Sequence, residues 1–358
     1  MTEGAVDQPG VDEIEISVFG RGFGECIVCH FGKGNWVIVD SLLTEERVPV
    51  ALAYLRSMGV DLTQVRSLIL THWHDDHVRG AAQIVKDCPN ATVTFPITLC
   101  GDEFKQLLKH YGNIVTGRFT NGVEELFHIL ELVKSQKHRR RFAVANKVLI
   151  ETADFRVDAL SPSEEDVERF MVAIHEWARE NGDGRLSKPA RNDTSVVVVA
   201  KVAGELILLG GDLEVRGPLS GWQAVHEIAW AGRGKATVFK VAHHGSKTGE
   251  YAPVWDDLLE LQPLTVLAPY NRGHKLPTSA DVKRICDRSG AAYSANTLEA
   301  RKGSRQNRTV DRTLAEANIR LFRLPAEVGQ VRLRKLVGAK MWDVALFNSA
   351  CRLQDIAA

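Results

Sequence analysis

Short apolar runs separated by glycine turns dominate the first third of the chain. Residues 13–19 (EIEISVF) alternate apolar and polar positions, as in a half-buried strand, and residues 26–31 continue in extended form after a glycine turn. Residues 36–41 (WVIVDS) and 65–71 (VRSLILT) are apolar and carry β-branched side chains, which is typical of strands buried on both faces. Between them, Val48, Leu52 and Leu55 at helical spacing predict a helix over residues 45–58. This order predicts a sheet with a helix packed against it.

From about residue 102 to 186 the pattern becomes partly helical. Apolar spacing predicts helices near residues 104–108, 123–133 and 164–179, with a hairpin in residues 146–163. No proline-, glycine- or serine-rich linker marks its edges, so we interpret residues 102–186 as an insertion within a single domain that spans residues 1–358. Strand patterns return at residues 194–202, 206–212, 237–244 and 263–271. The segment 301–358 is basic and predicts a closing hairpin over residues 329–353.

The composition is that of a soluble globular protein. The 358 residues include 45 Lys+Arg and 45 Asp+Glu, and 44% of them are hydrophobic. Residues 1–15 are acidic and polar, and no run approaches the roughly 18 apolar residues that cross a bilayer, so we expect no secretory signal and no membrane span.

The six cysteines are scattered, which predicts reduced thiols and a cytoplasmic protein. Alternation along the predicted strand turns Cys26 and Cys29 to opposite faces, so we expect them to pack rather than to bind metal.

Positive charge is unevenly distributed although the formal net charge is zero. One basic stretch covers residues 134–147 (KSQKHRRRFAVANK), and a second runs from residue 301 to residue 340. Each stretch alone is most simply a solvated surface. Two such stretches beside a hydrolytic site would favour an anionic polymer as substrate.

The main chemical signal is the sequence His72-Trp73-His74-Asp75-Asp76-His77. It follows directly on the buried strand predicted over residues 65–71, where the chain turns back. Side chains two positions apart in such a turn can converge on one ion, while the later ones reach a neighbouring ion. Neutral imidazoles and a carboxylate are ligands that suit zinc and similar divalent metals.

HWHDDH after SLILT resembles the signature of the metallo-β-lactamase superfamily. Further segments match in the family's order: GRGFGE–CIV, WVIVDS, THWHDDHVRG, NDTSVVVV, LLGGDLE, KVAHHGSKTG and NRGH. More narrowly, the set is similar to the soluble hydrolase domain of the bacterial competence DNA-uptake channel, over most of residues 14–275. The resemblance implies an α/β fold, an αββα sandwich of two mixed sheets flanked by helices. Two positions depart from the pattern: Glu25 stands where aspartate is usual, and Ser41 follows Asp40 where glycine is usual.

The resemblance also implies two divalent metal ions. His72 and His74 would hold one ion, and Asp76 and His77 would hold the second. Asp212 follows the apolar strand LILLGG, where its carboxylate could bridge both ions. Zinc suits these ligands best among the common metals, and manganese is a possible alternative.

The remaining ligands are implied by two later histidine positions. Strand alternation lets only one of His243 and His244 face inward, so one would complete the ligands of the first ion and the other would contact substrate. The sequence leaves this choice open, with a slight preference for His243 as the ligand. His274 in NRGH would bind the second ion.

Several polar residues near these ligands are expected to orient the imidazoles or to meet the substrate. Metal-bound histidines usually donate their second N–H to a carboxylate or carbonyl. The residues that could do so, or could contact an anionic substrate, are Asp40, Asp75, Asn192, Ser195, Ser246, Lys247 and Asn271.

The sequence therefore predicts a metal-dependent hydrolase with Asp76, Asp212, His243 and His244 as its catalytic residues. Two ions about 3.5–4 Å apart would supply a bridging hydroxide at neutral pH. The leading hypothesis is a phosphodiesterase, most simply a nuclease on DNA or RNA. One alternative is hydrolysis of a small ester, lactone or thioester. Another is a subunit of a larger defence or stress assembly, in which a protein partner docks on the helical insertion and controls the site.

Overall fold

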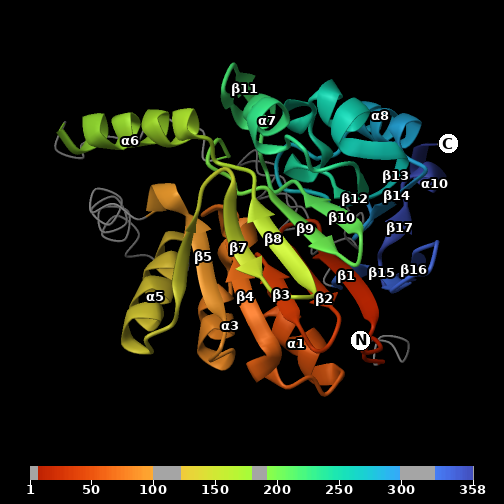
Figure 1. The fold of residues 1–358 in the computed structure, drawn as a ribbon, viewed down its shortest axis with the longest axis horizontal. Helices are drawn as coiled ribbons and strands as arrows, with labels where there is room; N and C mark the ends of the chain where they lie inside the picture. Colours follow the sequence, from red (N-terminus) through yellow and green to blue (C-terminus); the bar gives the residue numbers. More distant parts are fainter. Residues whose placement is uncertain (1–6, 100–121, 180–191, 299–326, 358) are drawn as a thin grey trace, which may run out of the picture.

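The computed structural model describes residues 7–99, 122–179, 192–298 and 327–357 (Figure 1). Within these residues the strands form two sheets of eight strands each. The first sheet has the spatial order β16 (Asp343–Phe347), β15 (Gly329–Leu336), β1 (Glu13–Gly20), β2 (Glu25–Phe31), β3 (Trp36–Val39), β4 (Val65–Ile69), β5 (Thr92–Pro96) and β6 (Arg140–Ala143). The second has the order β17 (Cys351–Arg352), β14 (Ala291–Ser294), β13 (Leu259–Leu267), β12 (Ala236–Lys240), β10 (Glu205–Leu209), β9 (Val198–Val202), β8 (Phe155–Ala159) and β7 (Lys147–Glu151).

Both sheets are mixed. In the first sheet β3 to β6 are parallel, whereas β1, β2, β15 and β16 pair in antiparallel fashion. In the second sheet β10, β12, β13 and β14 are parallel, and β7, β8 and β9 are antiparallel. The carboxyl ends of parallel strands are where open α/β sheets place their ligands, because the connecting loops converge there.

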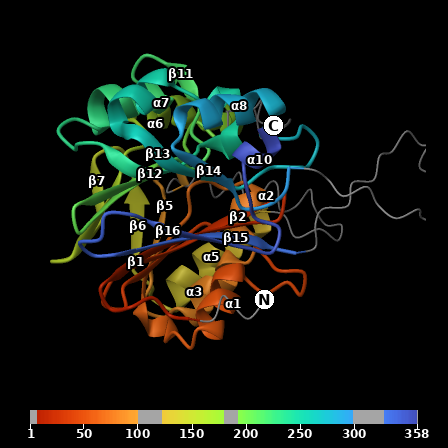
Figure 2. The same cartoon turned by 90° about the vertical axis from the view of Figure 1, so that its right-hand side faces the viewer.

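The two sheets pack face to face, and helices cover their outer faces (Figure 2). One buried cluster joins side chains of both sheets. It includes Ile16 and Ile27 from the first sheet and Ile207 from the second. This αββα sandwich is the architecture that the sequence predicts. Its helices are α1 (Val50–Ser57), α2 (Asp75–Val78), α3 (Ala81–Asp87), α5 (Gly122–Ser135), α6 (Glu164–Arg179), α7 (Gly221–Ala224), α8 (Ser279–Arg288) and α10 (Gln354–Ala357).

Short turns of other helical types complete the described elements. They are η2 (Leu62–Gln64), η3 (Ile97–Leu99), η4 (Val225–Ala229), η5 (His243–Gly245), η6 (Lys247–Gly249) and η7 (Val254–Leu258), together with the small strand β11 (Val215–Gly217). None of the helices in the described part of the chain is long and apolar enough to cross a membrane.

The predicted helix over residues 45–58 is shorter in the structure. Helix α1 begins at Val50, directly after Pro49, whose ψ of 126° is not helical. Proline lacks a backbone N–H and is tolerated at the start of a helix but not in its interior, so the helical spacing of Val48 does not extend the helix.

The region 102–186 is built into the sandwich over the part that the structure describes. Strand β6 extends the first sheet, and β7 and β8 extend the second. Helix α5 buries Leu126 and Ile129 in the core outside the first sheet. The predicted hairpin over residues 146–163 corresponds to β7 and β8, whereas β6 was not expected, because an edge strand such as RRFA carries few buried apolar residues. The division of the chain into one domain with an insertion stays a prediction. The helix expected near residues 104–108 lies outside the described residues.

The ends of the first sheet follow the sequence expectations. Strands β15 and β16 form the closing hairpin, and β15 pairs with β1 over eight residues from Glu13 to Gly20.

Cys26 and Cys29 are buried in different cores, Cys26 towards the outer helices and Cys29 between the sheets. Burial raises the pKa of both thiols above the usual range, so they pack as small apolar side chains.

Candidate metal centre

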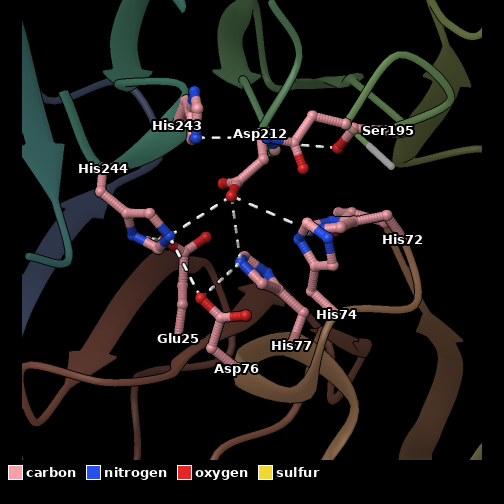
Figure 3. Close-up of polar contacts among 12 residues, drawn as sticks. Glu25, His72, His74, Asp76, His77, Ser195, Asp212, His243 and His244 are labelled. Atoms are coloured by element: carbon pink, nitrogen blue, oxygen red, sulfur yellow. Dashed lines mark hydrogen bonds and ion pairs between the residues drawn. The ribbon is translucent and has the colours of Figure 1, made fainter. Parts of the chain in front are cut away.

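Three loops at the carboxyl ends of parallel strands deliver the candidate ligands. Strand β4 leads into the HWHDDH motif, β10 leads into Asp212, and β12 leads into His243 and His244. Strand β4 belongs to the first sheet, and β10 and β12 belong to the second. The cluster therefore forms only where the two sheets face each other (Figure 3).

The motif loop is fixed by a buried carboxylate at the end of β3. Asp40 accepts hydrogen bonds from the backbone N–H and the hydroxyl of Thr71, both at 2.7 Å. Its Oδ2 also accepts from Nδ1 of His77 at 2.7 Å. Thr71 Oγ1 lies 3.0 Å from Nδ1 of His72 and can accept its proton. One carboxylate thus orients one imidazole directly and another through a hydroxyl, as ligand histidines require.

Asp212 lies at the centre of the cluster. Its Oδ2 is 3.3 Å from Nε2 of His244, 3.5 Å from Nε2 of His77 and 3.8 Å from Nε2 of His72. The carboxylate is 2% exposed. Its backbone N–H donates to Ser195 Oγ at 2.9 Å, and a Cβ at the preceding Gly211, whose φ is +50°, would lie 2.7 Å from that oxygen. A close turn that only glycine fits therefore brings Asp212 between the sheets.

The ligating atoms separate into two groups. In the first ligand group, Nε2 of His72 and Nδ1 of His74 lie 3.0 Å apart, next to Asp212. In the second ligand group, Oδ2 of Asp76 is 3.4 Å from Nε2 of His244 and 3.7 Å from Nε2 of His77. Asp212 Oδ2 adjoins both groups, which is the position expected of a bridging carboxylate.

In three of the imidazoles Nδ1 faces a protein acceptor and Nε2 faces the cluster, where Nε2 of His72 is also hydrogen-bonded to Nδ1 of His74. His72 and His77 use Nδ1 towards Thr71 and Asp40, and Nδ1 of His244 is 2.9 Å from the carbonyl oxygen of Ala268. Each Nε2 then points at the carboxylates of the cluster. The same tautomer in all three leaves Nε2 as the metal-binding atom.

The cluster has an uneven distribution of protons in the absence of metal. Burial lowers the pKa of His72 well below its usual value, and neighbouring imidazoles lower it further. Burial also disfavours the charged form of His77 and His244, but the nearby carboxylates, led by Asp212, outweigh this effect. They raise the pKa of His77 well above its usual value and the pKa of His244 to about 10. The same imidazolium groups outweigh burial at Asp76 and Asp212 and lower the pKa of both carboxyls.

The donor set fits a divalent metal. Nε2 of His77 and Oδ1 of Asp212 are buried but have no hydrogen-bond partner in the described part of the chain. Among the described residues three trios have ligand atoms close enough to share an ion: His72 with His77 and Asp212, Asp76 with His77 and His244, and Glu25 with Asp40 and His77. In the third trio, Glu25 pairs with Lys240 and Asp40 accepts from Thr71, so the first two trios are the free donor sets. Leaving buried polar atoms unpartnered is costly, so a cation that satisfies them would stabilise the fold.

The structure changes two of the sequence expectations. His244, not the preferred His243, faces the cluster, and it lies beside Asp76 in the second ligand group rather than in the first. His243 Nδ1 is 2.9 Å from Thr248 Oγ1 and 3.2 Å from Glu214 Oε1, on the pocket wall. Strand alternation fails here because β12 ends at Lys240 and both histidines have positive φ, 48° and 52°. His274 is exposed and lines the pocket, so its assignment to the second ion stays a prediction.

The other predicted residues have varied surroundings. Asp75 lines the pocket, accepts from Gly122 N–H at 2.6 Å and pairs with Arg79 at 2.9 Å. Asn192 donates to Glu214 at 3.0 Å and lies 3.2 Å from Nε2 of His243.

Three predicted residues lie away from the ligating atoms. Ser246 accepts from the backbone N–H of Thr248, and Lys247 is exposed and is not among the lining residues of the pocket. Asn271 is buried behind the pocket wall, where its N–H donates to the carbonyl of Gly22 at 2.6 Å.

The sequence analysis missed a buried ion pair behind the second ligand group. Lys240 Nζ lies 2.6 Å from Glu25 Oε1, and both side chains are 1% exposed. The lysine also donates to the carbonyl of Gly211 at 3.2 Å, next to Asp212. A lysine within the apolar run TVFKVA was a usable signal, since a charged residue in a buried strand requires a partner.

A pocket of about 620 Å³ opens over the cluster. Its floor carries His74, Asp76, Asp212 and His244. The other lining residues are Phe23, Asp75, Asn192, His243, Tyr270, Arg272, Gly273, His274 and Leu276. Substrate can therefore reach the ligating atoms from solvent.

The comparisons agree with this architecture. A family model of the metallo-β-lactamase superfamily matches residues 20–115, which include the HWHDDH motif. The chain has the metallo-β-lactamase fold. The match and the histidine–aspartate cluster together support a metal-dependent hydrolase.

Solved structures with the same fold are distant in sequence. The subclass B3 metallo-β-lactamase MEM-A1 from a soil metagenome library is 14% identical, with a TM-score of 0.37 over 68% of this chain and 83% of that one. The metallo-β-lactamase fold protein YhfI from Bacillus subtilis is 10% identical, with a TM-score of 0.40 over 78% and 95%. No curated protein shows significant similarity to the chain. Similarity at this level does not indicate a substrate.

Proposed function

We propose that the chain is a hydrolase of phosphodiesters that uses two divalent metal ions, zinc or manganese. The observation that carries the proposal is the convergence of two ligand groups on Asp212 at the floor of an open pocket. His72 and His74 would hold one ion, and Asp76, His77 and His244 the other. When bound, such ions would lower the pKa of water towards about 7 and polarise the scissile oxygen.

The protein's own residues would position the reaction. Asp212 would contact both ions and offset their charge in a buried site, where the carboxylate is 2% exposed. Asp40 would keep the inward nitrogen of His77 free by accepting the proton of its Nδ1. His243, on the pocket wall beside Glu214 and Asn192, would meet the substrate rather than the metal.

Support for a phosphodiester comes from the motif set similar to the competence hydrolase domain. The basic stretches add little within the described residues. Gly122, at the start of α5, contacts the motif loop, and Lys134 lies near the other end of this helix. At a rise of 1.5 Å per residue, these two residues are about 20 Å apart along the helix. Arg334 and Lys335 are paired with Glu15 and Glu205. The described parts of the two basic stretches therefore add no support for a long polymer over a short phosphodiester as the substrate.

Purified protein with zinc or manganese should be incubated with labelled single- and double-stranded DNA and RNA and with a short dinucleotide. Hydrolysis that disappears in both His74→Ala and Asp212→Ala would support the proposal. Cleavage that survives in both variants would reject it, because neither ligand group would then be needed.

Hydrolysis of a small ester, lactone or thioester is the second candidate. The size of the pocket and its apolar wall of Phe23, Tyr270 and Leu276 favour a small substrate. Turnover of a neutral ester should hardly change with salt, whereas binding of a charged polymer should weaken steeply.

Control by a protein partner and a cytoplasmic location stay predictions. Helix α5, which belongs to the segment proposed as a docking surface or a lid, packs its inner face into the core.

A further inference from the structure

The pocket wall that rises from the second ligand group is aromatic and ends in an arginine. The ring of Tyr270 lies 5.4 Å from that of His244, and the ring of Phe23 lies 5.7 Å from that of Tyr270. The guanidinium of Arg272 lies 4.9 Å from the centre of the Phe23 ring. The wall thus leads from a candidate metal ligand to a cation at the pocket rim.

The backbone that carries this arginine is anchored although its side chain is exposed. Tyr270 and Leu276 exchange two backbone hydrogen bonds at 2.8 and 2.7 Å, which closes the loop around Arg272. The adjacent Asn271 is 1% exposed and donates its N–H to Gly22 in the turn that bears Phe23. Gly22 has a φ of +80°, and a Cβ there would lie 2.7 Å from the Asn271 amide. The backbone of the Arg272 loop and the backbone of the turn that carries Phe23 are therefore fixed relative to each other.

The charge of Arg272 is not neutralised by the described part of the protein. It has neither an ion pair nor a hydrogen bond there, and it is the one lysine or arginine among the lining residues of the pocket. Arg79, which also contacts the ring of Phe23 at 5.6 Å, is paired with Asp75 at 2.9 Å. A guanidinium stacked on a ring keeps its in-plane N–H groups available, and their fork matches the oxygens of a phosphate.

The floor of the pocket carries the opposite charge. Asp75, Asp76 and Asp212 all line the pocket. Bound divalent ions would offset Asp76 and Asp212, and Arg272 would add positive charge at the exposed side of the pocket, where an anionic substrate enters. Building on the proposed function, we propose that Arg272, held on Phe23, binds the non-bridging oxygens of a phosphate diester and makes the site selective for a negatively charged ester.

The test compares a charged and a neutral ester with the metal-loaded enzyme. Arg272→Gln should raise KM for bis(p-nitrophenyl) phosphate by about ten- to a hundred-fold, with a smaller change in kcat, since a hydrogen bond to a charged group is lost. Turnover of p-nitrophenyl acetate should stay within about twofold, because no charged contact is involved. Arg272→Lys should fall between, as it keeps the charge without the fork. The matched control is Lys275→Gln, which removes an exposed cation from the same loop outside the pocket lining.

Equal effects of Arg272→Gln and Lys275→Gln, or equal losses on both esters, would overturn the proposal. A second measurement separates it from the proposed function. Inorganic phosphate should be titrated calorimetrically into wild type and Arg272→Gln, with and without zinc. Weaker binding in the variant under both conditions supports the anion contact even if no ester is hydrolysed. Equal binding rejects it even if the enzyme is active.

Discussion

The two ligand groups differ in how the fold builds them. His72 and His74 come from one loop of the first sheet, and Nδ1 of His72 is hydrogen-bonded to Thr71, whose hydroxyl donates to Asp40 in the same sheet. The second ligand group needs His244 from the second sheet, and behind it the Glu25–Lys240 pair joins β2 of one sheet to β12 of the other. The first group depends on a local turn, whereas the second depends on the docking of two sheets.

Removing the carboxylate that both groups share should have the largest effect. Asp212→Ala is expected to lower phosphodiester hydrolysis by about a thousand-fold, because several kcal/mol of transition-state stabilisation depend on paired ions. The zinc content per chain, measured by plasma mass spectrometry after dialysis, should also fall. Asp257→Ala is the matched control, since that carboxylate is 60% exposed and pairs only with His226 among the described residues. Unchanged metal content and activity in Asp212→Ala would contradict the bridging position.

The same contrast explains what the sequence could predict. The motif residues are recognisable because His72 to His77 lie within one turn after a buried strand. Asp212 was recognisable because it follows an apolar run and two glycines. The choice between His243 and His244 was not, because both residues have positive φ and the alternation of a strand no longer applies.

Long-range contacts were hidden for a related reason. Glu25 and Lys240 are separated by most of the chain, and only the face-to-face packing of the sheets brings them together. Likewise β6 joined the edge of the first sheet, where the apolar pattern of a strand is weak, and the predicted hairpin of β7 and β8 gave no sign of which sheet it would join. Local periodicity predicts elements well, but it does not assign them to a sheet.

Breaking the cross-sheet ion pair should test the dependence of the second group on docking. Lys240→Met leaves Glu25 charged and buried with only the more distant Nδ1 of His244, at 3.9 Å, as an ion-pair partner among the described residues, which should lower the free energy of unfolding by about 3 kcal/mol. Urea unfolding of the metal-free protein measures this change. The double variant Glu25→Leu/Lys240→Met should recover most of the loss, because no charge is then buried without a partner.

The exposed pair Lys283–Asp287 provides the control for that experiment. Its lysine is 73% exposed, so Lys283→Met should leave the unfolding midpoint unchanged within error. If Lys240→Met behaved like this surface variant, the buried pair would have no part in holding the sheets at the site.

Asp40→Asn should weaken both groups, and the second more than the first. The carboxylate accepts directly from His77 but reaches His72 only through Thr71. Loss of such an orienting partner typically weakens metal binding by about 10–100-fold. Competition with a chromophoric zinc chelator would measure two affinities, and the affinity that is also lowered by His244→Gln, which marks the second group, should change most. Asp61→Asn, at an exposed turn, is the control. An equal loss at both sites would mean that the relay through Thr71 is as strong as the direct bond.

The two groups should also differ in their dependence on pH. In the metal-free protein the pKa values of His77 and His244 are raised, that of His244 to about 10, whereas the pKa of His72 is lowered. At neutral pH the second group must therefore release protons before its Nε2 atoms can bind metal, and the first group is already neutral. Affinity at the second group should rise about tenfold per pH unit for each proton released, with little change at the first. Calorimetric zinc titrations in two buffers of different protonation enthalpy would count the protons, and His244→Gln should remove about one of them. Zinc binding without proton release in wild type would show that the carboxylates do not hold protons on the second group.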